Sequence, residues 1–369
     1  MRVGETKGAI SDLRKGRISR RELNRLMAYL GIGIAGASVF GRQARAADNL
    51  SVLTWSGYDI PEMAPDYYKK HPKPDFMLMG SDREGLQKVR AGYQPDLAHD
   101  TSFIVQTYRD AGLIDPIDLS RLTHWNEVFP PLQKLEFVDN QMWIAPCSWG
   151  NSSVVYRPDL VKPKEESWEI LWDPSLKGRL SQRDDVEVVA LAGLLIGAKD
   201  RYAMTDDELA KAKEKLLAQK PLLRFYWSSQ TDLEQSLSSG EVVASYAWNA
   251  SAALLKKQGV PIAMMQPKEG MLTWTDGLVL FKNRRGPTDL AYEFINAYMA
   301  PEVGKFLIED YGYGSANMEA FKIADKERLE ALGIEDPDRT LNGAIFIKEI
   351  RKDLQTKYNE VFDYVKFSS

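Results

Sequence analysis

The sequence predicts an α/β protein that divides into two domains, and three observations support this prediction. Short apolar segments alternate with amphipathic segments of about ten to fifteen residues, which is typical of βαβ units and a parallel sheet. The chain has 369 residues, and a single hydrophobic core stops growing before that length. No internal repeat of about 20–50 residues and no low-complexity tract is present, which excludes solenoids and propellers.

Residues 1–46 are expected to be a removable export signal. They carry ten Lys/Arg against three Asp/Glu, then an uncharged stretch over 26–41, and "ARA" at 44–46, which predicts cleavage before Ala47. The uncharged stretch is shorter than the ~20 residues that span a bilayer. The segment "SRREL" at 19–23 resembles a twin-arginine signal, although Leu23 stands where Phe is commonest, and an ordinary Sec signal is the alternative.

Without this signal the chain is strongly acidic. Removing its ten basic and three acidic residues from the totals of 48 and 52 leaves a net charge of −11. This charge argues against nucleic acid or anionic lipid as a partner and is compatible with a cationic ligand. Cys147 is the only cysteine and lies far from the cleavage site, so we expect neither an internal disulfide nor a lipid anchor.

The first part of the mature chain is expected to alternate three strands with three helices. The strands are predicted at 51–55, 75–80 and 95–99, and the helices at 62–71, 82–92 and 102–113. Parallel sheets of this kind bind ligands outside the carboxyl ends of their strands. Residues 55–56 and 100–101 fall at those ends.

The later part continues the alternation. A helix is predicted over 183–197, and two more follow capping boxes at Thr205/Glu208 and Thr231/Glu234. Strands are predicted over 242–248 and 262–266, and a terminal helix over the last thirty residues.

Sequence patterns for catalysis or metal binding are absent. His71, His99 and His124 are scattered, and no His or Cys pair has metal-ligand spacing. There is no Gly-x-Ser-x-Gly elbow and no phosphate-binding Gly-x-x-x-x-Gly-Lys-Ser/Thr loop. We therefore expect no catalytic residue, no metal and no cofactor, although a hydrolase or lyase using paired carboxylates stays open as an alternative.

Aromatic and polar residues instead gather where the predicted strands end. They are Trp55, Ser56, Tyr58, Thr101, Phe103, Trp248, Trp274 and Asp276, and Asp185 at a helix start adds another carboxylate. Indole and phenol faces attract a desolvated ammonium by ~0.5–2 kcal/mol each, and carboxylates supply the counter-charge. The pattern predicts a slot for an organic amine.

Most of these residues also have a purely structural interpretation. Asp185 could complement a helix N-terminus, Trp248 and Trp274 could be core aromatics, and Tyr58 could pack a loop. Asp276 is harder to explain in this way, because a carboxylate at the end of an apolar strand must be solvated or paired.

Several motifs occur in a characteristic order: "TWSGY", "AGYQPDLAHDTSF", "MWIAPCSWGNSSVVYRPDLV", "SGEVVASYAWNAS", "WTDGLVLFKN" and "YGYGSAN". Over most of the mature chain they resemble the periplasmic spermidine/putrescine-binding proteins, the solute receptors of ABC importers. The resemblance implies a monomeric periplasmic protein that is not an enzyme. It would capture a polyamine or related small organic cation and deliver it to the transmembrane subunits of an ABC permease.

The resemblance also implies roles for individual residues. The ligand's chain would stack between Trp248 and Trp274, with one amine on Asp276 and another on Asp185. Further matched positions are Ser56, Tyr58, Thr101, Phe103 and Tyr313. Gly57 stands where characterised members carry an acid, and Val188 where the spermidine-type members carry a glutamate. A diamine or smaller amine therefore fits the charge count better than a long polyamine.

The implied fold has two α/β lobes with a ligand cleft between them, joined by crossings near Ser152 and Gly277. Lobe one would comprise 47–152 and 278–335, and lobe two 153–277, with 336–369 as a C-terminal helix of undetermined lobe. Trp274 and Asp276 would face the cleft, opposite Trp55. The alternative on the same scaffold is a carboxylate, sugar or metal complex as ligand; an anion would need an Arg or Lys in the cleft, and the matched positions carry none.

Overall fold

The computed structural model describes residues 49–80 and 82–368 of the chain. The predicted export signal over 1–46 and the cleavage site before Ala47 lie outside these described residues. Within the described ranges, no helix has both the length and the apolar character needed to cross a bilayer.

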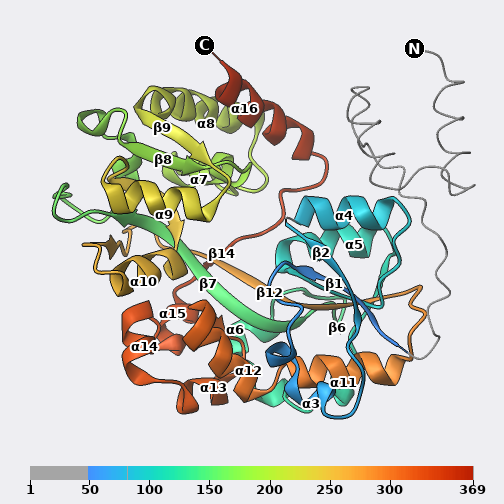
Figure 1. Cartoon of the computed structure of the whole chain (residues 1–369). Helices are drawn as coiled ribbons and strands as arrows, with labels where there is room; N and C mark the ends of the chain where they lie inside the picture. The colour runs from blue at the N-terminus through green and yellow to red at the C-terminus, as the bar shows by residue number, and fades with distance from the viewer. Residues whose placement is uncertain (1–48, 81, 369) are drawn as a thin grey trace, which may run out of the picture. The chain divides into compact units, whose positions relative to one another are not determined.

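A mixed sheet is the framework of the described chain, with the strand order β2-β1-β3-β12-β7-β10-β8-β9 (Figure 1). The strands are β1 (Ser51–Trp55), β2 (Asp75–Met79), β3 (Leu97–Thr101), β7 (Ala145–Tyr156), β8 (Leu180–Arg183), β9 (Leu223–Trp227), β10 (Ala244–Trp248) and β12 (Leu272–Phe281). The predicted α/β class is confirmed, and β2 and β3 run parallel to β1 as the alternating pattern indicated.

Helices flank the parallel strands β1, β2 and β3 on both faces (Figure 1). They are α3 (Pro65–Tyr68) and α11 (Thr288–Tyr298) on one face, and α4 (Asp82–Arg90) and α5 (Val105–Asp110) on the other. Successive strand residues point to opposite faces. Val52 is accordingly buried in a cluster with residues of α3 and α11, and Leu53 in a cluster with residues of α4 and α5. Burial on both faces favours a nearly continuous apolar strand, and adjacent Val52 and Leu53 meet this condition in β1.

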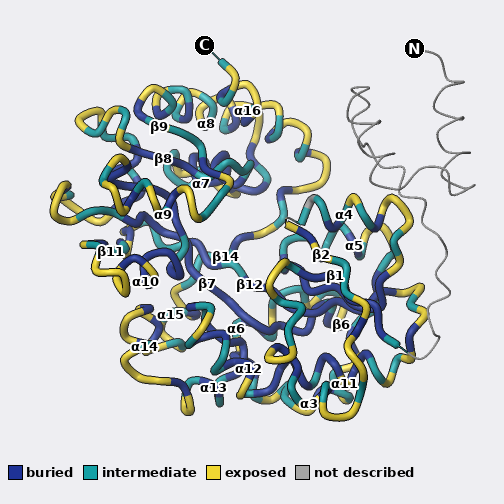
Figure 2. Tube along the Cα trace, in the orientation of Figure 1, coloured by how far each residue is buried: buried dark blue, intermediate teal, exposed yellow. Residues whose placement is uncertain are grey.

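Two long strands, β7 and β12, run between two hydrophobic cores and are buried over nearly their whole length (Figure 2). On β7, Trp149 belongs to a core shared with the parallel strands, whereas Val154 belongs to a core built on β8 and β10. On β12, Leu278 belongs to the same core as Trp149, and Leu272 belongs to the same core as Val154. We call the parts around these two cores lobe one and lobe two. The lobe boundaries near 152 and 277 stay a prediction.

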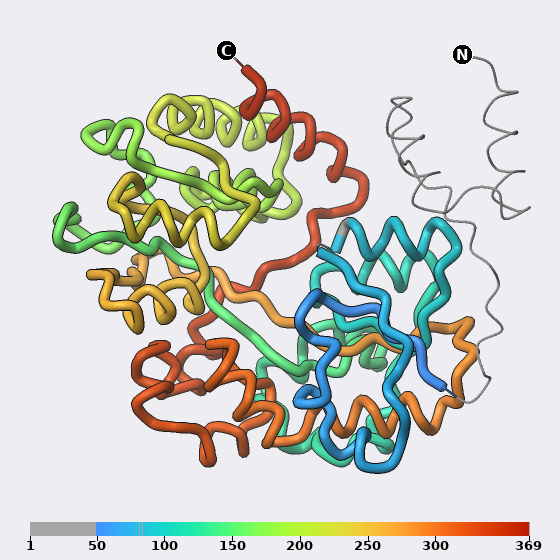
Figure 3. Tube along the Cα trace, in the orientation of Figure 1, coloured from blue at the N-terminus to red at the C-terminus, as the bar shows by residue number. Residues whose placement is uncertain are grey.

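The C-terminal segment makes a third passage between the two cores, which the sequence did not predict (Figure 3). The short strand β14 (Ile345–Phe346) pairs with β12 in parallel. Leu341 is buried in the core of lobe one, whereas Ile347 is buried in that of lobe two. The terminal helix α16 (Gln355–Phe367) is shorter than expected, and its Tyr358 is buried in the core of lobe two.

Several predicted helices have different boundaries in the structure. The helix predicted over 102–113 is η2 (Ser102–Ile104) followed by α5, and α4 ends at Arg90. In place of a helix over 62–71 there are η1 (Pro61–Met63) and α3, because Pro65 pushes Ala64 out of the helical region to φ −154° and ψ 56°. In place of a helix over 183–197, Arg183 ends strand β8 and the helix α7 spans Glu187–Leu195. The strand is set by long-range pairing with β9 and β10, which periodicity within the segment does not show.

One of the two predicted capping boxes is confirmed. Thr205 and Glu208 exchange both hydrogen bonds at the start of α8 (Asp206–Gln219). The box at Thr231 and Glu234 was wrong, because the side chain of Ser229 caps α9 (Gln230–Ser239) through the backbone N–H of Asp232.

Candidate functional site

The strand pairing brings several predicted site residues to one region of the sheet. Asp276 of β12 lies opposite Thr101 at the end of β3. On the other side of β12, Trp274 lies opposite Gly150 of β7. Trp248, at the end of β10, lies opposite Ser152 of β7. Residues from distant parts of the sequence are therefore placed by three neighbouring strand pairs.

Asp276 is a buried carboxylate, with 4% of its surface exposed. Its Oδ1 accepts hydrogen bonds from the backbone N–H of Ser148 at 3.1 Å and from the Ser148 hydroxyl at 2.6 Å. Its Oδ2 lies 3.4 Å from Nε2 of His99, which has no aligned hydrogen-bond partner among the described residues. One oxygen is thus well satisfied, whereas the other has one weak contact within the described part of the chain.

His99 belongs to this site, although the sequence treated it as an isolated histidine. Its Nδ1 lies 3.3 Å from the Thr54 hydroxyl and 3.2 Å from the Tyr298 hydroxyl, which fix the orientation of the ring. The ring of Tyr58 packs edge-on against it, with centroids 4.8 Å apart. His99 stands two residues before Thr101 on the same strand and hence on the same face, a signal that sequence reasoning could have used.

An aromatic wall forms next to Asp276. The Trp274 indole packs edge-to-face with Tyr313 at 4.8 Å and lies over Gly150, where a Cβ would overlap the indole ring. Its Nε1 is buried without a hydrogen-bond partner among the described residues. Burial, and next the negative charge of Asp276, raise the pKa of both Tyr58 and Tyr313 above the usual value for a phenol. These two hydroxyls therefore stay protonated and can donate hydrogen bonds at neutral pH.

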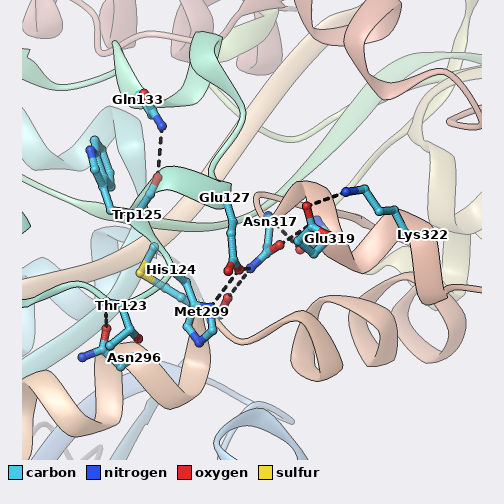
Figure 4. Close-up of polar contacts among 11 residues, drawn as sticks. Thr123, His124, Trp125, Glu127, Gln133, Asn296, Met299, Asn317, Glu319 and Lys322 are labelled. Carbon is cyan, nitrogen blue, oxygen red and sulfur yellow. Dashed lines mark hydrogen bonds and ion pairs between the residues drawn. The ribbon is translucent and has the colours of Figure 1, made fainter.

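The segment "YGYGSAN", which carries Tyr313, is fixed at both ends. The Tyr311 hydroxyl donates to the carbonyl of Gly57 at 2.5 Å, and Ser315 pairs with Ser148 on β7. Asn317 donates to Glu127 at 2.7 Å and to the carbonyl of Met299 at 3.0 Å (Figure 4). The position of Tyr313 beside Trp274 is therefore imposed by contacts on either side of it.

A second group of predicted residues lies in lobe two. Trp248 packs edge-to-face on Trp227 at 5.1 Å. Asp185 accepts a hydrogen bond from the backbone N–H of Glu187 at 2.9 Å, which is the structural role that the sequence left open for it. Arg183 lies beside both, with its guanidinium carbon 5.3 Å from the Trp248 ring centroid and a nitrogen 3.4 Å from Asp185 Oδ2. Arg183 is not among the positions that match the family motifs, so the sequence did not predict this cation at the site.

The remaining predicted residues surround the first group. Trp55 is half-buried and packs against the cluster that contains Leu53, and Ser56 is exposed directly after β1. The Thr101 hydroxyl donates to Asp82 at 2.7 Å, and Phe103 packs against the core of lobe two. The structure thus gathers Tyr58, Trp274, Asp276 and Tyr313 closely, and holds Asp185 and Trp248 as a separate pair.

Other features of the described residues do not compete with this site. Two open surface hollows of about 350 and 360 Å³ lie elsewhere, one beside α3 and one between α8 and α16, and neither is lined by a predicted site residue. Over 49–80 and 82–368, no group of three His, Cys, Asp or Glu residues is arranged to hold a metal ion.

Comparison with known proteins identifies the family. Residues 86–333, more than half of the chain, match the family described as "Bacterial extracellular solute-binding protein". The chain therefore belongs to this family of solute-binding transport proteins. The predicted family, its two-lobed α/β fold and a location outside the cytoplasm are confirmed.

Individual relatives carry more specific names. The chain is 29% identical over 303 residues to the spermidine/putrescine-binding periplasmic protein of Escherichia coli (strain K12), covering 79% of this chain and 85% of that protein. It is 26% identical over 320 residues to the putrescine/agmatine-binding protein of Pseudomonas aeruginosa, covering 80% of this chain and 85% of that protein. A solved structure of the spermidine/putrescine ABC transporter substrate-binding protein PotD from Streptococcus pneumoniae matches with a TM-score of 0.73 at 20% identity, covering 86% of this chain and 98% of that chain. This last similarity bears on the fold alone.

Proposed function

We propose that this protein captures a small organic amine in the periplasm and delivers it to the transmembrane subunits of an ABC permease. It acts as a monomeric binding protein and not as an enzyme. The relatives named for spermidine, putrescine and agmatine support an amine as the ligand class. Family membership supports the transport role.

The buried carboxylate of Asp276 carries this proposal. Burying an ionised carboxylate is costly unless it is paired, and its one ion-pair contact among the described residues is His99 at 3.4 Å. A ligand ammonium near Oδ2 would supply the missing counter-charge. The aromatic rings of Tyr58, Trp274 and Tyr313 would add cation–π attraction around it.

The other predicted residues take secondary roles in this proposal. The ligand's chain leaves Asp276 along Trp274 and reaches Trp248 and Asp185 in lobe two. Residues at the rim of the cleft make polar or packing contacts: Trp55, Ser56, Thr101 and Phe103. The lobes close on the ligand by bending β7 and β12 near 152 and 277.

A thermal-shift screen of amines tests the proposal. A ligand at 100 times its dissociation constant should stabilise the protein by ~2.7 kcal/mol, which corresponds to roughly 4 °C for a chain of about 320 residues. The bound amine should be recovered unchanged after prolonged incubation. Shifts caused only by neutral sugars or dicarboxylates, or chemical conversion of the amine, would overturn the proposal.

A further inference from the structure

We infer that Arg183 makes the lobe-two end of the site a partner for a carboxylate, so that the ligand carries one ammonium and one carboxylate. An ω-amino acid has this pattern, whereas a diamine or polyamine does not. This inference rests on the proposed binding of an ammonium by Asp276, and it names the substrate class for the same site.

The first observation is that a cation of the protein itself already occupies the contacts expected for a second ammonium. The resemblance implies that Asp185 holds that ammonium and that Trp248 stacks on the ligand's chain beside it. In the structure, the Arg183 guanidinium lies 5.3 Å from the Trp248 ring centroid and 3.4 Å from Asp185. A second ammonium would have to displace Arg183 or bind beside a like charge, and both are unfavourable.

The second observation is the charge balance at this end of the site. Lys366 contacts both carboxylate oxygens of Asp184 at 2.7 Å, so this acid is neutralised. Glu187 accepts a hydrogen bond from Tyr202 at 3.1 Å, and burial raises its pKa to about 7 although the charge of Arg201 opposes the rise. Among the described residues at the start of α7, Asp184 and Asp185 are thus each paired with a cation of the protein, and Glu187 lies beside the charge of Arg201.

The third observation is that Arg183 keeps hydrogen-bonding capacity. A guanidinium has five N–H donors in a planar fork, which matches the two oxygens of a carboxylate. Its ion pair with Asp185 is long at 3.4 Å and engages one nitrogen, and about a quarter of the side chain is exposed. Arg183 also lies beside the buried hydroxyl of Tyr246, which can accept a hydrogen bond from one of its N–H groups. A ligand carboxylate would accept hydrogen bonds from N–H groups of the fork that Asp185 and Tyr246 do not engage.

Calorimetric titration with probes matched in chain length tests the inference. The pairs are 4-aminobutanoate with 1,4-diaminobutane, and 5-aminopentanoate with 1,5-diaminopentane. The parent protein should bind the amino acid at least about ten-fold more tightly than the diamine of a pair. Arg183→Gln should weaken amino-acid binding by about ten-fold or more and strengthen diamine binding, while Arg183→Lys should keep part of the preference because the charge remains.

A matched control separates this effect from a general loss of stability. Arg224 lies at the start of β9, away from the strand ends that carry the site, and forms an exposed pair with Glu241 at 3.1 Å. Arg224→Gln should leave both affinities unchanged. Tighter binding of the diamine by the parent, with no response to Arg183→Gln, would overturn the inference and leave the proposed function intact. Binding of neither probe class, with retention of a non-amine solute, would overturn the proposed function itself.

Discussion

The Asp276→Asn substitution removes the charge proposed to hold the ligand's ammonium and nearly preserves the shape of the side chain. The amide oxygen can still accept both hydrogen bonds from Ser148, now at 3.1 and 2.6 Å. Because Asp276 is only 4% exposed, solvent screens it little, and its interaction with an ammonium exceeds the ~0–1 kcal/mol of a surface pair. Removing one member of a buried charge pair costs ~2–5 kcal/mol, or roughly 30- to several-thousand-fold in the dissociation constant.

Isothermal titration of the parent and of Asp276→Asn with the amine found by screening measures this loss. Without ligand, the free energy of unfolding of the variant should lie within about 1 kcal/mol of that of the parent, because the substitution also removes a buried and incompletely paired charge. Asp289→Asn is the matched control, since Asp289 is 88% exposed and pairs with Arg121 on the surface. A folded Asp276→Asn variant that binds the amine within about three-fold of the parent would refute the reasoning.

Three further predictions follow from other contacts. Trp274→Ala should weaken binding more for longer amines than for shorter ones. Gly150→Ala should have an effect in the same direction, because a Cβ at position 150 would overlap the Trp274 indole. Titration with a series of amines of increasing length measures both effects. Burial raises the pKa of Glu187 to about 7 in the folded protein. The contribution of its protonated form to the free energy of unfolding is therefore fully present below about pH 4.5, and about 3 kcal/mol is lost as pH rises through about 7. Glu187→Gln should remove this loss, which thermal melts at pH 5 and pH 8 measure. Ligand should lower the radius of gyration in X-ray scattering, and an unchanged profile at saturation would contradict hinge closure.

Local sequence patterns predicted β1 at its observed boundaries but ended β3 too early. The run "SVLTW" is apolar enough to be recognised as a strand and is bounded by a turn at Gly57, whose φ is +94°. β3 continues through the polar residues Asp100 and Thr101, because the side chain of each forms a hydrogen bond with another side chain. Asp100 accepts a hydrogen bond from Tyr108 at 2.9 Å, and burial, followed by the nearby Asp82, raises the pKa of its carboxyl. Composition alone cannot show that a polar residue will be satisfied inside a sheet.

The same limit explains which site residues the sequence found. Asp276 was predicted because a carboxylate in an apolar run is anomalous within the segment itself. His99 is not anomalous within its own segment. Its spacing of two from Thr101 indicates a shared face, but its contact with Asp276 depends on the pairing of β3 with β12, more than 170 residues apart in the sequence. A resemblance transfers only positions that match a known motif, so it assigned Asp185 and Trp248 to the ligand and was silent on Arg183. The structure places Arg183 against both, and a single unmatched residue thereby changes the expected charge of the ligand from two positive groups to one.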